Sequence, residues 1–189
     1  GVPDSGLDGA VGYAQAAGLP YAIGFVKNRY VGRTFLSPGQ RVRERLVDVK
    51  LSVIASAVRG KRVVLLDDSV VRGTTAAGIV GKLRAAGAAE VHLRLTAPPF
   101  LAPCYYGTDI PDDRQLIAAH HTLEEVRDIL GCDSLGYLPR ACLGRLLGPG
   151  HQAGYCEACF GGVYAAGTPQ ITGKDRFERK RSEGKGEDD

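Results

Sequence analysis

The sequence predicts an α/β protein with a doubly wound, mainly parallel sheet. An apolar run at 62–66 and an alternating segment at 90–97 predict strands, and segments at 7–17 and 74–86 predict helices between them. Strands that alternate with helices in this way are typical of parallel sheets covered by helices. The chain has 189 residues, 44% of them hydrophobic and 24% charged, which suffices for one domain with a sizeable core.

The N-terminal half contains clear start and stop signals. Residues 7–17 are rich in Ala and are followed by Gly18 and Pro20, which end a helix. The other elements expected there are a short strand at 21–26, a loop rich in Lys, Arg and Tyr at 27–38, a helical turn at 40–46, and a segment at 49–58 in which a strand turns into helix or loop.

The remaining elements have equally local causes. The helix at 74–86 ends at Gly87, and Thr122 with Glu125 forms the capping box of a helix that runs to Leu130 and ends at Gly131. A short helix is expected at 141–147, and a Gly-rich loop at 148–173. We therefore expect one domain over 1–165 and a charged, disordered tail over 166–189.

Composition argues against several classes of protein. No apolar run approaches the roughly 20 residues that span a bilayer, and the first residues lack the pattern of a signal peptide. The net charge of +3 is too small to indicate nucleic-acid binding. We expect a cytoplasmic protein with no membrane or nucleic-acid partner. Met is absent even at position 1, so we expect a processed chain or a fragment whose N-terminal part is missing.

The most informative segment leads from a strand into a helix. Four apolar residues run directly into two acids, and a short turn then opens the helix. Ligands of open α/β sheets bind where strands end, and a Thr at the start of a helix can cap it and leave backbone N–H groups for an anion. An ordinary strand–turn–helix is the alternative. The segment is Val63-Val64-Leu65-Leu66-Asp67-Asp68-Ser69-Val70-Val71-Arg72-Gly73-Thr74-Thr75.

This segment resembles the 5-phosphoribosyl 1-pyrophosphate (PRPP) motif of the type I phosphoribosyltransferases. The resemblance implies that residues 69–75 hold the 5-phosphate of PRPP. Asp67 and Asp68 would accept hydrogen bonds from the ribose hydroxyls and offer oxygen atoms to Mg²⁺, a hard ion that prefers such ligands.

A second segment, residues 27–35, carries three cations within seven positions. Lys27, Arg29 and Arg33 suit a pyrophosphate leaving group, whose negative charge grows as the glycosidic bond breaks. A glycine within the segment would let it close over substrate. A solvated basic loop is the alternative. The segment reads Lys27-Asn28-Arg29-Tyr30-Val31-Gly32-Arg33-Thr34-Phe35.

Further motifs stand in the same order as in one enzyme family. Over 1–165 the chain resembles the glutamine phosphoribosylpyrophosphate amidotransferases, or amidophosphoribosyltransferases. The two segments above carry this resemblance together with Pro3-Asp4-Ser5-Gly6, Ala97-Pro98-Pro99, Pro103-Cys104-Tyr105-Tyr106-Gly107-Thr108-Asp109-Ile110, Gly131-Cys132-Asp133-Ser134-Leu135 and Cys156-Glu157-Ala158-Cys159-Phe160.

The resemblance implies a pentosyltransferase of the type I fold, truncated at its N-terminus. It would make 5-phosphoribosylamine from PRPP and glutamine-derived ammonia, the first step of de novo purine biosynthesis. Purine nucleotides would be inhibitors, and the protein a homo-oligomer. The family's N-terminal glutaminase domain has no counterpart here, so we expect no glutamine hydrolysis by this chain alone. The implied roles are Mg²⁺ binding by Ser5, Asp67 and Asp68, and catalysis by Lys27, Arg29, Tyr30 and Arg33.

Three cysteines have the spacing of a metal site. Cys156-x-x-Cys159 with the distant Cys104 suggests metal ligation. The resemblance implies that they are three ligands of a [4Fe–4S] cluster, which needs four thiolates, with the fourth upstream of Gly1. We expect the cluster in the full-length parent and an incomplete one here. Unpaired thiols and a Zn²⁺ site are the alternatives.

Two other functions remain open at this point. One is a regulator that senses PRPP without catalysis, and the other is an inactive fragment. A regulator of this kind should carry a winged-helix DNA-binding segment and a basic surface, and the sequence suggests neither. The basic segment at 27–35 also favours the enzyme.

Overall fold

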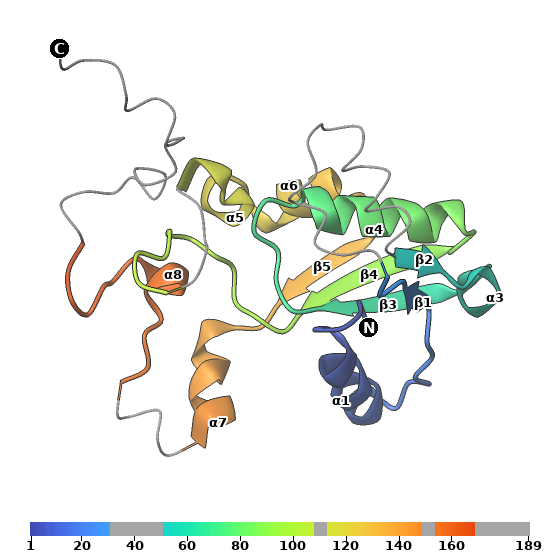
Figure 1. The fold of residues 1–189 in the computed structure, drawn as a ribbon, viewed down its shortest axis with the longest axis horizontal. Helices are drawn as coiled ribbons and strands as arrows, with labels where there is room; N and C mark the ends of the chain where they lie inside the picture. Colours follow the sequence, from blue (N-terminus) through green and yellow to red (C-terminus); the bar gives the residue numbers. More distant parts are fainter. Residues whose placement is uncertain (31–50, 108–112, 149–153, 169–189) are drawn as a thin grey trace, which may run out of the picture.

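Three parallel strands form the main sheet in the order β3 (Arg62–Asp67), β4 (Glu90–Leu95) and β5 (Ser134–Tyr137). The computed structural model describes residues 1–30, 51–107, 113–148 and 154–168 (Figure 1). Leu65 pairs with Leu93, and Leu93 with Leu135, so the carboxyl ends of the strands lie at the same edge of the sheet. The predicted parallel α/β fold is confirmed.

Helices cover both faces of this sheet, as Figure 1 shows. The helix α4 (Thr74–Ala85) connects β3 to β4, and α6 (Leu123–Leu130) precedes β5 on the same face. The helix α1 (Leu7–Ala17) packs against β3 from the opposite face. The sheet is therefore doubly wound, with the β3–α4 junction at its carboxyl edge.

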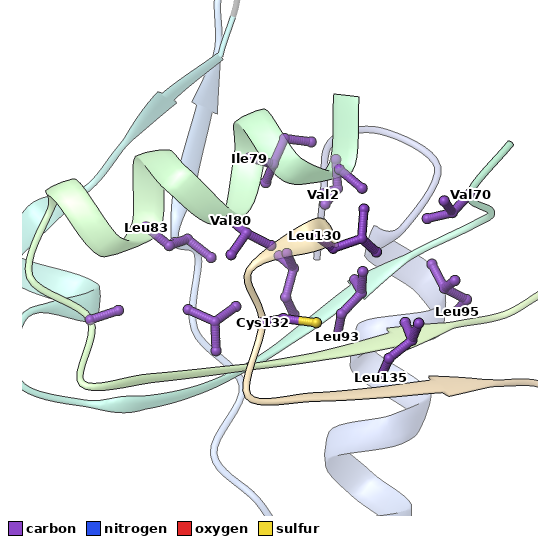
Figure 2. Packing of buried hydrophobic residues seen from close by; sticks show 14 of the residues in the cluster. Val2, Val70, Ile79, Val80, Leu83, Leu93, Leu95, Leu130, Cys132 and Leu135 are labelled. Carbon is purple, nitrogen blue, oxygen red and sulfur yellow. The ribbon is translucent and has the colours of Figure 1, made fainter. Parts of the chain in front are cut away.

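The hydrophobic core lies between the sheet and the pair α4 and α6 (Figure 2). The buried residues of α4 recur at helical spacing, for example Ile79, Val80 and Leu83, whereas Leu93 and Leu95 of β4 alternate with half-buried residues. Full burial of one such side chain contributes roughly 1.5–3 kcal/mol. These two periodicities fix which face of each element points inward, and hence the direction of the β3–α4 turn.

Capping residues set the ends of two helices where the sequence predicts them. α1 spans Leu7–Ala17 and is followed by Gly18 in the left-handed region, with φ of 64°. Thr122 and Glu125 form the capping box of α6, and Gly131 ends this helix with φ of 70°. Glycine tolerates this backbone conformation because it has no Cβ.

The strand expected at 21–26 is shorter and shifted. β1 (Phe25–Lys27) pairs antiparallel with β2 (Leu51–Val53), and α3 (Ala55–Val58) follows β2 as expected. Of the residues at 21–27, only 25–27 pair with a neighbouring strand, so residues 21–24 form no regular strand.

The C-terminal half departs further from the sequence-based expectation. The sequence pattern did not predict β5, the short helix α5 (Ile117–His120) after a 3₁₀ turn (Asp113–Gln115), or α8 (Ala158–Gly161) within the expected loop. The helix expected at 141–147 is a 3₁₀ turn (Arg140–Cys142) followed by α7 (Leu143–Leu147). The expected turn at 40–46, and the tail beyond residue 168, lie outside the described residues.

None of the helices in the described ranges combines the length and the apolar character that crossing a bilayer requires.

Candidate functional site

An open pocket of about 700 Å³ lies at the carboxyl end of β3, where the chain turns into α4. This volume is typical of sites for small molecules. The structure thereby brings Ser5 of the N-terminal turn next to both acids and the whole predicted anion turn. The lining residues are Val2, Ser5, Asp67, Asp68, Ser69, Val70, Val71, Arg72, Gly73, Thr74, Thr75, Ala76 and Ile79.

The N-terminus of α4 opens into this pocket without a side-chain cap. The N-cap residue is Gly73, with φ of 84°, rather than Thr74 or Thr75, which the sequence suggested as caps. In the described part of the chain, no group accepts a hydrogen bond from the backbone N–H of Thr74, Thr75 or Ala76. Such N–H groups and the positive end of the helix dipole form a binding site for an anion.

Gly73 has no room for a side chain. A Cβ at this position would lie 2.8 Å from Cδ1 of Ile117 and 3.3 Å from Cδ2 of Leu130. The Ile117 N–H also donates a hydrogen bond of 2.9 Å to the carbonyl oxygen of Val71. The helices α5 and α6 therefore support the turn from behind and hold its N–H groups toward the pocket.

The two acids have different surroundings. Asp67 is buried, 9% exposed, and its carboxylate accepts a hydrogen bond of 2.9 Å from the backbone N–H of Asp68. Burial raises the pKa of Asp67 to about 6; the charge of Asp68 raises it as well, and that backbone hydrogen bond lowers it. Asp68 is exposed and accepts a hydrogen bond of 3.0 Å from the Ser69 hydroxyl. A buried carboxylate beside an exposed one suits a bound cation, because the N-terminal ammonium of Gly1 is the cation that lowers the pKa of Asp67, and no Lys or Arg side chain among the described residues pairs with it.

The turn at residues 1–6 is fixed to the end of β3. The Val2 N–H donates to the carbonyl oxygen of Leu66 at 2.8 Å, and the Gly6 N–H donates to that of Val2 at 2.9 Å. A Cβ on Gly6 would lie 2.4 Å from the Leu66 oxygen, so only glycine fits. This packing places Ser5 at the pocket.

These groups suit Mg²⁺ by their chemistry. Ser5, Asp67 and Asp68 offer hydroxyl and carboxylate oxygens, which are hard ligands. Across the described residues, no group of three or more His, Cys, Asp or Glu side chains is arranged to hold a metal ion. Mg²⁺ is commonly held by only one or two carboxylates together with substrate phosphates, and the donor set fits that mode.

None of the described residues of the basic segment lines the pocket, and only Lys27 is joined to a neighbour of a lining residue. The Lys27 ammonium forms an ion pair of 2.5 Å with Asp4, next to Ser5, and this hydrogen bond is the main reason that the pKa of Asp4 is lowered. Arg29 and Tyr30 are exposed and do not line the pocket. Arg33 lies outside the described residues. Sequence reasoning missed Asp4, and its only signal was its position beside Ser5 in a turn.

Two distant segments bring the three predicted metal-binding cysteines into one region. The backbone N–H groups of Leu101 and Ala102 donate to the carbonyl oxygen of Cys159, at 2.8 and 3.1 Å, and the Phe100 and Phe160 rings stack with centroids 5.0 Å apart. Burial raises the pKa of Cys159, and the nearby Cys104 and Cys156 raise it further.

None of the five cysteines forms a disulfide. A [4Fe–4S] cluster needs four thiolates, and the described residues hold no set of metal ligands in this region. Cys132 is buried, with its thiol directed at the carbonyl oxygen of Arg127. The arrangement in this chain therefore does not fit a complete cluster.

Comparisons with known proteins agree with this arrangement. The chain is 52% identical over 169 residues to the amidophosphoribosyltransferase of Archaeoglobus fulgidus, covering 89% of this chain and 37% of that protein. It is 50% identical over 169 residues to the amidophosphoribosyltransferase of Bacillus subtilis, covering 87% and 35%. It thus spans little more than a third of these relatives. No model of a known protein family matches the chain.

Solved structures show the same relationship in three dimensions. The structure described as the allosteric regulatory enzyme of purine biosynthesis superposes with a TM-score of 0.76 at 48% identity, over 87% of this chain and 36% of that one. The glutamine PRPP amidotransferase from B. subtilis complexed with ADP and GMP gives a TM-score of 0.75 at 48% identity, over 86% and 36%.

Proposed function

The chain belongs to the amidophosphoribosyltransferase family, and from this premise we propose that it is the part of such an enzyme that binds PRPP and transfers its phosphoribosyl group. The product would be 5-phosphoribosylamine, made from PRPP and ammonia in the first step of de novo purine biosynthesis. One observation carries the proposal: Ser5, both acids and the open N-terminus of α4 line one pocket.

Each part of PRPP has a matching group in this pocket. The 5-phosphate binds the backbone N–H groups at the start of α4 and the hydroxyls of the turn at 69–75. The exposed Asp68 accepts hydrogen bonds from the ribose hydroxyls, and the buried Asp67 and Ser5 offer further oxygen atoms at the same edge of the pocket. Mg²⁺, when bound with PRPP, would be held by Ser5, Asp67 and Asp68 and would neutralise the pyrophosphate.

Catalysis in this proposal is mainly positioning and charge stabilisation. The glycosidic bond breaks with positive charge growing on the ribose and negative charge on the pyrophosphate, so a fixed anion site and nearby cations lower the barrier. Lys27 is paired with Asp4, which directly precedes the pocket residue Ser5. Arg29, Tyr30 and Arg33 follow on the same segment and complete the proposed pyrophosphate site.

The proposal includes the partners that a longer parent enzyme would supply. Ammonia would come from glutamine through a glutaminase domain of that parent, so this chain alone would use free ammonia. The B. subtilis relative is described in complex with ADP and GMP, and purine nucleotides are therefore the proposed inhibitors. A homo-oligomer in the cytoplasm is also part of the proposal, although the relative from Glycine max is named chloroplastic.

The iron–sulfur cluster is proposed only for a parent chain that adds a fourth thiolate. Cys104, Cys156 and Cys159 would be three of its ligands. No step of the proposed reaction depends on the cluster.

The function is tested by two measurements on the full 189-residue chain. Titration calorimetry with Mg-PRPP measures binding, and an assay with PRPP and ammonium measures formation of phosphoribosylamine and pyrophosphate. We expect binding, and turnover that requires both Mg²⁺ and ammonium. The variant Asp128→Asn, at an exposed acid on the surface of α6, serves as a folded control with unchanged binding.

The outcomes separate the candidate functions. Binding without turnover would refute catalysis by this chain and favour a PRPP sensor. Neither binding nor turnover, in a chain that melts cooperatively, would refute the proposal as a whole and leave an inactive fragment.

A further inference from the structure

We propose that Asp4 is a positioning residue, which holds the Lys27 ammonium beside the pocket so that it meets the pyrophosphate of PRPP. The two side chains form an ion pair of 2.5 Å although they are 23 residues apart in sequence. The choice of pyrophosphate as the ligand rests on the function proposed above, whereas the ion pair itself does not.

Asp4 belongs to a turn whose backbone is well constrained. Asp4 lies between Val2 and Gly6. Val2 is buried in the core and its backbone N–H donates a hydrogen bond to Leu66, and Gly6 approaches Leu66 so closely that no side chain fits there. The next residue, Ser5, lines the pocket. The backbone at Asp4 is therefore fixed relative to the pocket, and its carboxylate, 57% exposed, reaches Lys27 from this turn.

Lys27 comes from a less constrained part of the fold. It is the last residue of β1, which pairs with β2 in a two-stranded sheet separate from β3, β4 and β5. Its side chain is 27% exposed, whereas the following Arg29 and Tyr30 are exposed. The Asp4 carboxylate is the group that directs this flexible four-carbon side chain to the Ser5 turn.

The chemistry of an ammonium allows Lys27 to serve both partners. It has three N–H donors, so one can stay on Asp4 while two bind phosphate oxygens. A side chain that is already ordered loses less freedom when ligand binds. Removing the charge of Asp4 should therefore weaken ligands that carry the pyrophosphate and spare ligands that lack it.

Two ligands and a matched control test this role by calorimetry. Asp4→Asn is expected to weaken Mg-PRPP binding roughly 3- to 10-fold and to leave binding of ribose 5-phosphate, which has no pyrophosphate, unchanged. Asp8→Asn, at an exposed acid in the first turn of α1 that pairs with no other side chain in the described part of the chain, should change neither. In a Lys27→Gln background, Asp4→Asn should cause no further loss.

Three results would overturn the positioning role. They are an equal loss for both ligands, an unchanged affinity for Mg-PRPP, and a full additional loss in the Lys27→Gln background. The first would show a structural role at the turn, the second that Asp4 does not matter, and the third that it does not act through Lys27.

A measurement without any ligand tests the ion pair separately. The rate at which acetic anhydride acylates Lys27, followed by peptide mass spectrometry, should be several-fold higher in Asp4→Asn than in the wild type or Asp8→Asn. Equal rates would refute the ion pair whether or not PRPP binds. A higher rate in a protein that binds no PRPP would keep the ion pair but refute both its role and the proposed function.

Discussion

At the scale of single residues, the two neighbouring acids differ in what they can do. Asp68 is exposed and open to ligand, whereas Asp67 is buried with a raised pKa. The first suits recognition of hydroxyls, and the second needs a cation when ionised.

Replacement of Asp68 by Asn should impair use of substrate without unfolding the protein. The variant keeps an acceptor but loses the charge, and hydrogen bonds to a charged group contribute about 1.5–3 kcal/mol, so kcat/KM for Mg-PRPP should fall roughly 10- to 100-fold. Steady-state kinetics and a thermal melt measure both effects. Asp128→Asn, at an exposed acid on α6, is the control. Wild-type kinetics in the Asp68 variant would refute its assigned role.

The buried Asp67 should make stability fall as pH rises. Its pKa is about 6 in the folded protein, against an ordinary value of 3.8, so between about pH 4 and pH 6 the unfolded chain binds fewer protons and stability decreases with pH. The difference corresponds to roughly 3 kcal/mol at most above pH 6. Mg-PRPP affinity should change in the opposite direction and fall as pH drops through about 6.

The variant Asp67→Asn tests this sign. It keeps the acceptor for the Asp68 N–H, so urea unfolding at about pH 7.5 should show a gain of roughly 1–3 kcal/mol, shrinking toward pH 4, together with loss of Mg-PRPP binding. A gain that is equal at both pH values would contradict the burial account.

At the scale of elements, the β3–α4 turn depends on the helices behind it. Gly73→Ala forces a Cβ toward Ile117 and Leu130 at a left-handed position, which should cost about 1–3 kcal/mol and weaken PRPP binding. Gly78→Ala is the matched control, because Gly78 lies within α4 and a Cβ added there would meet no atom within 4 Å. It should stabilise the protein by roughly 0.5–1 kcal/mol.

Urea unfolding measures the stability of both glycine variants, and calorimetry measures their PRPP binding. If Gly73→Ala were as stable and as active as Gly78→Ala, the turn would not be held as described.

Local sequence signals predicted some elements well and others poorly, for physical reasons. The apolar run before Asp67 and the capping box at Thr122 each carry their cause within a few residues. Strand β5 has only four residues, of which only Leu135 is buried, so it has no clear periodicity. The cap at Gly73 and the pair of Asp4 with Lys27 depend on contacts between distant segments, which sequence spacing does not reveal.

At the scale of the whole molecule, the cysteines are also brought together by contacts between distant segments. Their spacing pointed to a metal site, and the fold brings Cys104, Cys156 and Cys159 into one region through the packing of residues 100–102 on 159–160. Three of the five thiols lie in this region, so a fourth ligand for a cubane would have to come from another part of the structure or from a longer parent chain.

Anaerobic treatment of the full chain with iron and sulfide should therefore give no stable [4Fe–4S] cluster, because a cubane needs four thiolates and the described structure gathers only three of the five cysteines. Iron and sulfide analysis after gel filtration measures this. A full cluster in each chain would contradict the expectation. If Cys142→Ser then abolished it, Cys142, whose thiol accepts a hydrogen bond of 2.9 Å from Arg145, would be the fourth ligand.

The central proposal for the whole molecule is that PRPP binds at the carboxyl end of β3, with its 5-phosphate on the open N-terminus of α4. Titration of the ¹⁵N-labelled chain with Mg-PRPP, followed by NMR, tests this claim most directly. The largest shifts should fall on the backbone amides of residues 69–76, with smaller ones at Ser5, Asp67 and Asp68. Saturable binding that leaves these amides unchanged, or shifts centred on another edge of the sheet, would contradict it.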